Sequence, residues 1–152
     1  MHLSGSVIRP ARQSDAPQIA ECVQLAYECY VPLLGMKPNP MLDDYTEVIE
    51  KNQVSVLVAA DRLVGVVVLE ITDEGLLLNN IAVHPSYKGQ GYGSQLLCFA
   101  EEQAIRDGFK SIYLYTNVKM LENQSIYAAR GFVEYARRSE RSAWRIHEKD
   151  IS

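Results

Sequence analysis

A glycine-rich turn at residues 88–94 (KGQGYGS) is the feature that most constrains how this chain folds. The turn follows a short apolar run at 76–83, typical of a strand, and precedes a segment to about 107 with helical periodicity. Glycines let the backbone approach a ligand closely, and the free N–H groups at the start of a helix attract phosphate. The turn therefore predicts a phosphate site between a strand and a helix.

Three phosphate-binding patterns compete for this turn. A Walker loop needs a lysine directly after its last glycine, and no lysine follows Gly93. The dinucleotide pattern G-x-G-x-x-G fails from both starting glycines, because Ser94 and Leu96 occupy the third glycine positions. The third pattern, [QR]-x-x-G-x-[GA], fits residues 88–93 with lysine in its first position. Lys88 can still contact a phosphate, as a point charge without the planar fork of arginine.

This third pattern is the acetyl-CoA signature of the GCN5-related N-acetyltransferases (GNATs), which the chain resembles over nearly its whole length. Residues 80–85 (NIAVHP) look like the family's fourth strand and its exit. Residues 123–132 (NQSIYAARGF) resemble its second motif, N-x-x-x-x-Y-x-x-x-G-F, and residues 114–117 (LYTN) are also common in the superfamily. Two motifs in the correct order and at the correct separation are far more specific than either alone.

The rest of the sequence is consistent with one domain over residues 1–152, with 47% apolar and 22% charged residues. We expect a mixed α/β (α+β) fold: a GNAT-like sheet of about six or seven strands, with an antiparallel meander, one βαβ crossover and about four helices. The expected strands are 7–9, 53–60, 63–71, 76–83, 110–117, 132–138 and 142–148. The expected helices are one that Ser14 or Asp15 caps and that reaches about Tyr30, then 41–51, one that the turn at 89–93 opens and that runs to Asp107, and 123–130, with an irregular loop at 31–40.

The resemblance implies acetyl-CoA as the co-substrate. Its pantetheine arm should pair with the main chain of residues 81–83, where two parallel strands splay apart. Its pyrophosphate should rest on the N–H groups of residues 89–94, Asn123 should reach the arm, and the Tyr127 hydroxyl should lie near the thioester sulfur. The implied cofactor-binding residues are Ile81, Ala82, Val83, Lys88, Gly89, Gln90, Gly91, Tyr92, Gly93, Ser94, Asn123 and Tyr127.

For the proposed chemistry, the sequence offers a candidate residue to assist the leaving thiolate but no obvious base for the amine. The reference pKa of a phenol is about 10 and that of a thiol about 8.5, so Tyr127 is expected to donate a hydrogen bond to the thiolate, with general acid catalysis as a hypothesis. Some members of the superfamily carry a glutamate where this chain has Leu77 or Tyr115. Strand alternation puts Leu77, Asn79 and Ile81 on one face, so Asn79 is our candidate to hold a water that relays the proton. Glu70 is the nearest strand carboxylate, and we interpret it first as an exposed edge charge.

The missing base favours an acceptor amine of low pKa. A lysine-like amine of pKa about 10.4 is only about 0.04% neutral at pH 7. An α-amine of pKa about 7.7–8.0 is roughly 10–15% neutral and needs no strong base. The sequence therefore predicts either a low-pKa amine or deprotonation through water.

Residues of the first helices and the loop between them are expected to shape the acceptor site. Tyr27, Tyr30 and Tyr115 are the candidate substrate residues, with core packing as the alternative for the first two. Asp43 and Asp44 either attract a cationic amine or serve the first turn of a helix. Four arginines in the final hairpin indicate either a solvated edge or a contact to the cofactor's phosphates: Arg137, Arg138, Arg141 and Arg145.

The predicted function is an N-acetyltransferase acting on a primary amine of a small molecule or a peptide amino terminus by direct attack. A lysine side-chain acetyltransferase and a non-catalytic acyl-CoA-binding module remain as alternatives. The formal net charge of −4 argues against a nucleic-acid or anionic-membrane partner, and both a monomer and a homodimer stay open.

Compartment and metal content follow from what the sequence contains. No secretory signal and no apolar run of about 18 residues is visible, which predicts a cytoplasmic protein. Cys22, Cys29 and Cys98 have no C-x-x-C or zinc-ligand spacing, so we expect three buried thiols in a reducing cytosol and no metal.

Overall fold

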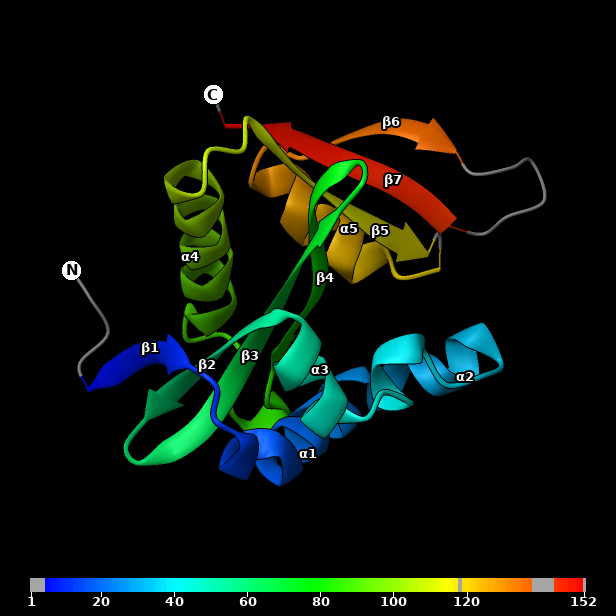
Figure 1. Cartoon of the computed structure of the whole chain (residues 1–152). Helices are drawn as coiled ribbons and strands as arrows, with labels where there is room; N and C mark the ends of the chain where they lie inside the picture. Colours follow the sequence, from blue (N-terminus) through cyan, green and yellow to red (C-terminus); the bar gives the residue numbers. More distant parts are fainter. Residues whose placement is uncertain (1–4, 118, 138–143, 152) are drawn as a thin grey trace.

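The computed structural model describes residues 5–117, 119–137 and 144–151. Within these ranges the chain forms a seven-stranded mixed sheet in the order β1-β2-β3-β4-β5-β7-β6 (Figure 1). All neighbouring strands in this order are antiparallel except β4 and β5, which are parallel. The strands are β1 (Ser6–Pro10), β2 (Gln53–Ala59), β3 (Arg62–Thr72), β4 (Gly75–Val83), β5 (Ser111–Asn117), β6 (Val133–Arg137) and β7 (Trp144–Asp150). The predicted meander, crossover and final hairpin are confirmed.

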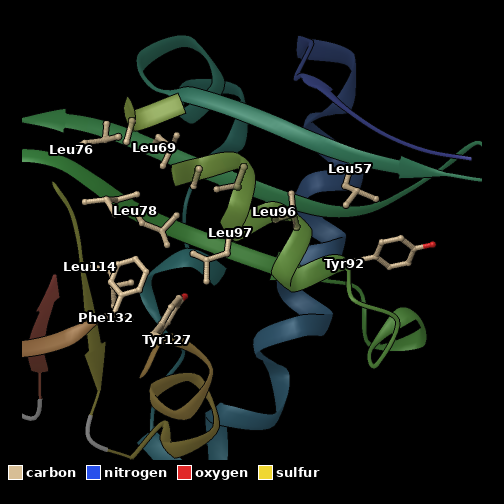
Figure 2. Close-up of a cluster of buried hydrophobic side chains, with 14 of the residues drawn as sticks. Leu57, Leu69, Leu76, Leu78, Tyr92, Leu96, Leu97, Leu114, Tyr127 and Phe132 are labelled. Carbon is tan, nitrogen blue, oxygen red and sulfur yellow. The ribbon is translucent and has the colours of Figure 1, made fainter. Parts of the chain in front are cut away.

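Helices cover both faces of this sheet. They are α1 (Ala16–Tyr27), α2 (Val31–Leu34), α3 (Tyr45–Lys51), α4 (Tyr92–Arg106) and α5 (Leu121–Ala129). On one face α4 packs its buried residues against the inner side chains of β2 to β5, and this cluster is drawn in Figure 2. On the other face α1 and α3 pack against β2 and β3. Among the described residues, no helix combines the length and the apolar character that crossing a membrane requires.

Several local expectations were wrong. Residues 31–40 contain the short helix α2 and the start of a 3₁₀ turn at Asn39–Met41, because Pro32 fits the first turn of a helix and Gly35 ends it at φ 73°. The predicted position of Asp15 at the N-cap of α1 is confirmed, although its carboxylate accepts from the Arg9 guanidinium at 2.8 Å and from Arg12 N–H at 2.7 Å rather than from an N–H of the helix. Of the three cysteines only Cys22 is buried, whereas Cys29 and Cys98 are exposed.

A β-bulge in β4 changes which side chains face which helices. Val68 pairs with Asn80 and Leu69 pairs with Leu78, so Asn79 is an extra residue without a partner in β3. Before the bulge, Leu78 faces the α4 side; after it, Ala82 faces the α1 side and Ile81 packs on the α4 side. The expectation that Leu77, Asn79 and Ile81 share one face was therefore wrong for Ile81, because strand alternation holds only where the ladder is regular.

The parallel pairing of β4 and β5 is short. Among the described residues it consists of Leu76 with Ile112 and Leu77 with Tyr113, both near the start of the strands. Beyond this point the two strands separate. In Figure 1 β4 continues towards α1, whereas β5 runs beside β7 towards the right of the view. This separation places the later residues of β4 beside a gap in the sheet.

The close approach of α4 to β3 generates a prediction at Gly65. A Cβ atom there would lie 2.8 Å from Leu96 Cδ1 and 3.2 Å from the main-chain oxygen of Ala82. We expect Gly65→Ala to lower the free energy of unfolding by about 1–3 kcal/mol, because the helix or β4 must shift. Urea unfolding measures the change, with Ser55→Ala on the neighbouring strand as control. An unchanged unfolding midpoint would show that this packing is looser than the geometry indicates.

Candidate active site

Two cavities meet at the gap between β4 and β5. The first, of about 220 Å³, lies between the end of α1, the end of β4, the glycine turn and α5. The second, of about 520 Å³, lies between β4, β5 and the segment at 38–43. Their described linings have two residues in common, Tyr27 and Tyr127. These two phenols therefore lie on the boundary between the two cavities.

The main chain of β4 turns groups that no neighbouring strand pairs towards the gap; one of them, the Ile81 carbonyl, accepts from the Tyr27 hydroxyl at 3.3 Å. His84 N–H donates to the Val64 carbonyl at 2.8 Å, which fixes the phase of the β3–β4 ladder. In an antiparallel ladder these groups alternate residue by residue, so Ala82 points its N–H and C=O to β3. Ile81 and Val83 then point theirs to the opposite edge, where the described part of β5 no longer pairs. An extended ligand can add to this edge as a short strand does.

The glycine turn ends against the same cavity and forms an anion cradle. Gly89 has φ 78° and Gly91 has φ 85°, left-handed values that favour glycine at both positions. Helix α4 begins at Tyr92, and its first internal hydrogen bond runs from Gln95 N–H to the Gly91 carbonyl at 3.0 Å. The N–H groups of residues 92–94 precede that bond and are available to an anion at the positive end of the helix dipole.

Most of the predicted cofactor residues come together in the first cavity. Those in its lining are Ile81, Ala82, Val83, Lys88, Gly89, Gly91, Tyr92, Gly93 and Tyr127. Gln90 and Ser94 belong to the same turn but are outside this lining. Asn123 lies in the first turns of α5, one turn before Tyr127, and its side chain is outside the described part of the structure.

Tyr127 extends from α5 into the interior. Figure 2 shows its ring beside Phe132, and their centroids are 5.7 Å apart in an edge-to-face contact. The side chain is only 8% exposed. Burial, and then the neighbouring phenol of Tyr30, raise the pKa of Tyr127 well above its ordinary value. The phenol therefore stays neutral near pH 7 and offers a hydrogen-bond donor.

The three predicted substrate residues divide between the two cavities. Tyr115 lines the second cavity, Tyr30 lines the first, and Tyr27 lines both. The rings of Tyr27 and Tyr30 lie 6.1 Å apart at the end of α1. Tyr27 is thus the one of the three that touches both compartments.

The two asparagines of the β4 bulge have different environments. Asn79 is exposed at the rim of the second cavity, and its amide donates to Glu70 Oε1 at 2.8 Å. Asn80 is buried, and its amide contacts the hydroxyls of Tyr27 and Tyr45. The sequence reasoning selected Asn79 and missed Asn80. A polar residue inside an apolar strand was the available signal, because a buried amide requires partners.

Carboxylates are scarce in the second cavity. Among its described lining residues Asp43 is the acidic one, and burial raises the pKa of its carboxyl. Asp44 instead accepts a hydrogen bond from Thr46 N–H at 3.1 Å as the N-cap of α3. Arg138 and Arg141 lie outside the described residues, as do the side chains of Arg137 and Arg145. Over the described parts of the chain, no group of three or more His, Cys, Asp or Glu residues gathers as metal ligands do.

Comparisons with known proteins point to one family. The model of the acetyltransferase (GNAT) domain matches residues 50–134. An uncharacterized N-acetyltransferase of Bacillus subtilis (strain 168), YvbK, is 32% identical over 95 residues, which are 62% of this chain and 61% of that protein. This match therefore spans about three fifths of the relative's length.

Solved structures share the whole architecture. The PaiA N-acetyltransferase of Thermoplasma acidophilum, in complex with coenzyme A, has a TM-score of 0.82 at 18% identity, covering 95% of this chain and 98% of its own. The ribosomal-protein-S18-alanine N-acetyltransferase of Escherichia coli has a TM-score of 0.76 at 20% identity, with coverage of 97% and 94%. An Elizabethkingia anophelis acetyltransferase with acetyl-CoA bound has a TM-score of 0.72 at 16% identity, covering 97% and 99%. At these identities the likeness shows the fold alone.

Proposed function

We propose that this chain, which belongs to the GNAT acetyltransferase family, transfers an acetyl group from acetyl-CoA to a primary amine. The observation that carries this proposal is the meeting of two cavities at Tyr27 and Tyr127, beside the unpaired edge of β4. One cavity has the groups that an acyl-CoA needs. The other shares Tyr27 and Tyr127 in its lining and, at about 520 Å³, has room for an amine.

The first cavity suits the donor. The pantetheine arm carries amides that pair with the main chain of Ile81 and Val83, and the pyrophosphate rests on the N–H groups of residues 92–94. Lys88 in the cavity lining adds a positive charge near the phosphates. The coenzyme A complex of the Thermoplasma protein and the acetyl-CoA complex of the Elizabethkingia protein support the same ligand for this fold.

The reaction requires one bond to form and one to break. The neutral amine nitrogen attacks the thioester carbon, the new N–C bond forms, and the C–S bond then breaks. Main-chain N–H near Val83 stabilises the negative oxygen of the intermediate, as in an oxyanion hole. In the net reaction the nitrogen loses one proton and the sulfur gains one. Tyr127 stabilises the departing thiolate by a hydrogen bond, since its raised pKa opposes full proton transfer.

The acceptor is a small-molecule amine or a peptide amino terminus. The described lining of the second cavity has no carboxylate on β4 or β5, where a strong base for a lysine ammonium would stand. An α-amine is roughly 10–15% neutral at pH 7 and needs only water as base. A peptide carrying one α-amine and one lysine separates the alternatives: mass spectrometry should find the acetyl group on the α-amine, whereas lysine acetylation would support the side-chain enzyme.

Replacing the Tyr127 hydroxyl tests the leaving-group role. We expect Tyr127→Phe to lower kcat about 10- to 100-fold and to leave the KM for acetyl-CoA within about twofold, because the hydrogen bond strengthens as the thiolate forms. The measurement is release of free thiol at saturating amine. Tyr113→Phe is the matched control: this buried phenol contacts Thr72 at the far end of the strands. An unchanged kcat in Tyr127→Phe contradicts the assignment.

Binding and turnover together separate the enzyme from a binding module. Calorimetry with acetyl-CoA should show binding to the wild-type chain, and a panel of primary amines should then release thiol. Binding without turnover on any amine would favour a non-catalytic acyl-CoA-binding module. No binding at all would remove the basis of the proposal.

Asp43 gives the second cavity a preference for positively charged acceptors. We expect Asp43→Asn to raise the KM for a diamine about threefold, and to leave the KM for a monoamine of equal length unchanged, because a partly exposed charge pair is worth well under 1 kcal/mol. The difference should shrink in 1 M salt. Asp44→Asn is the matched control, since it removes the same charge and asparagine still caps α3. Equal effects of the two variants would contradict a role for Asp43.

A further inference from the structure

We infer that a chain of hydrogen bonds with one fixed direction, from Tyr27 and Asn80 through Tyr45 to Pro40, makes the Tyr27 oxygen the hydrogen-bond acceptor for the attacking amine. The inference rests on the proposed function, because it assigns a partner to the N–H group of the acceptor. It assigns Asn80, whose amide is engaged by Tyr27 and Tyr45, as a positioning residue that acts through Tyr27.

The direction of this series of hydrogen bonds is set at the end formed by Pro40. The hydroxyl of Tyr45 lies 2.6 Å from the main-chain oxygen of Pro40. A carbonyl oxygen only accepts, so Tyr45 must donate its single proton there. The same hydroxyl lies 3.1 Å from the Asn80 amide, and it can now only accept from that side. The atom of Asn80 that faces Tyr45 is therefore the NH₂ group.

This assignment fixes the other end of the amide. The remaining atom of Asn80 is its carbonyl oxygen Oδ1, which lies 2.8 Å from the Tyr27 hydroxyl. Tyr27 must donate there, and its next neighbour, the Ile81 carbonyl at 3.3 Å, is also an acceptor. Both partners of the Tyr27 hydroxyl in the described structure are therefore acceptors of its proton. The lone pairs of the Tyr27 oxygen are left to accept a hydrogen bond from a ligand.

The bulge in β4 makes this geometry possible. The extra residue Asn79 turns the next residue, Asn80, towards the α1 side of the sheet, where Tyr27 and Tyr45 are buried. Burial, followed by the nearby phenols of Tyr127, Tyr45 and Tyr30, raises the pKa of Tyr27. The phenol is therefore neutral near pH 7, and its proton remains on the bond towards Asn80.

The attacking nitrogen needs such an acceptor. Its lone pair must face the thioester carbon in the first cavity. Its N–H groups therefore need hydrogen-bond acceptors among the residues that line the boundary between the cavities. Tyr27 lines both cavities at this point. As the nitrogen becomes positive during attack, its N–H becomes a stronger donor, so the bond to Tyr27 stabilises the transition state more than the bound amine. The Asn80 amide takes up no proton, so the network orients the amine and the proton leaves by another route.

A double-mutant cycle tests the inference. We expect Tyr27→Phe to lower kcat/KM for the amine about 10-fold, the effect of one hydrogen bond, with the KM for acetyl-CoA within about twofold because the ring is kept. Asn80→Leu should lower kcat/KM for the amine by a similar factor. In the Tyr27→Phe background Asn80→Leu should have almost no further effect, because it acts through the Tyr27 hydroxyl. A merely structural asparagine would give independent, multiplying losses.

A second variant guards against loss of the fold. Asn80→Leu removes one hydrogen bond from each of two buried hydroxyls, so thermal unfolding is measured alongside the kinetics. Where this variant does not fold, Tyr45→Phe takes its place, since it removes the bond that fixes the amide direction and keeps Asn80. Its effect on kcat/KM for the amine should also vanish in the Tyr27→Phe background.

The outcomes distinguish this inference from the proposed function. Wild-type turnover of amines with an unchanged kcat/KM in Tyr27→Phe, or with multiplying losses in the double variant, overturns the inference and leaves the acetyltransferase proposal intact. A wild-type chain that binds acetyl-CoA and acetylates no amine overturns both. Turnover with the non-multiplying pattern supports both.

Discussion

The early end of pairing between β4 and β5 is the constraint on which the site depends. Among the described residues two pairs join these strands, and beyond them the edge of β4 presents the main-chain groups of Ile81 and Val83 to a cavity. Main-chain groups inside a protein need partners: the Ile81 carbonyl accepts from the Tyr27 hydroxyl at 3.3 Å, and the other groups of this edge are left to water or a ligand. The glycine turn follows directly after that edge, which means that one continuous segment provides both the strand-like contacts and the anion cradle.

The bulge at Asn79 adds a second function to the same strand. Without it, alternation would leave Asn80 on the α4 side, among the leucines of the larger cluster. The extra residue turns Asn80 towards Tyr27 and Tyr45 and directs Ile81 and Val83 to the α4 side. The cost of burying an amide is offset because both of its ends are hydrogen-bonded. A single inserted residue therefore connects the donor edge of β4 to the acceptor side of the fold.

The sequence was informative where function depends on local backbone. Gly89 and Gly91 adopt the left-handed values that a tight turn before a helix requires, and Gly108 ends α4 as predicted. The bulge was not predictable by the same means, because the run at 76–83 reads as a strand in either register. The partners of Asn80 come from helices more than 30 residues away in the chain. Such pairings arise from tertiary packing, for which a single sequence has no periodic signal.

The two sides of the site therefore differ in how they are built. The donor side uses main-chain atoms of β4 and the turn, so most side-chain changes there leave its hydrogen-bonding groups in place. The acceptor side uses side chains and one main-chain oxygen from four separate segments: α1, the Pro40 segment, α3 and β4. A change in any one of these segments alters the series of hydrogen bonds that orients the Tyr27 hydroxyl. It follows that acceptor preference in this fold can change while acyl-CoA binding is retained, because the two depend on different kinds of atoms.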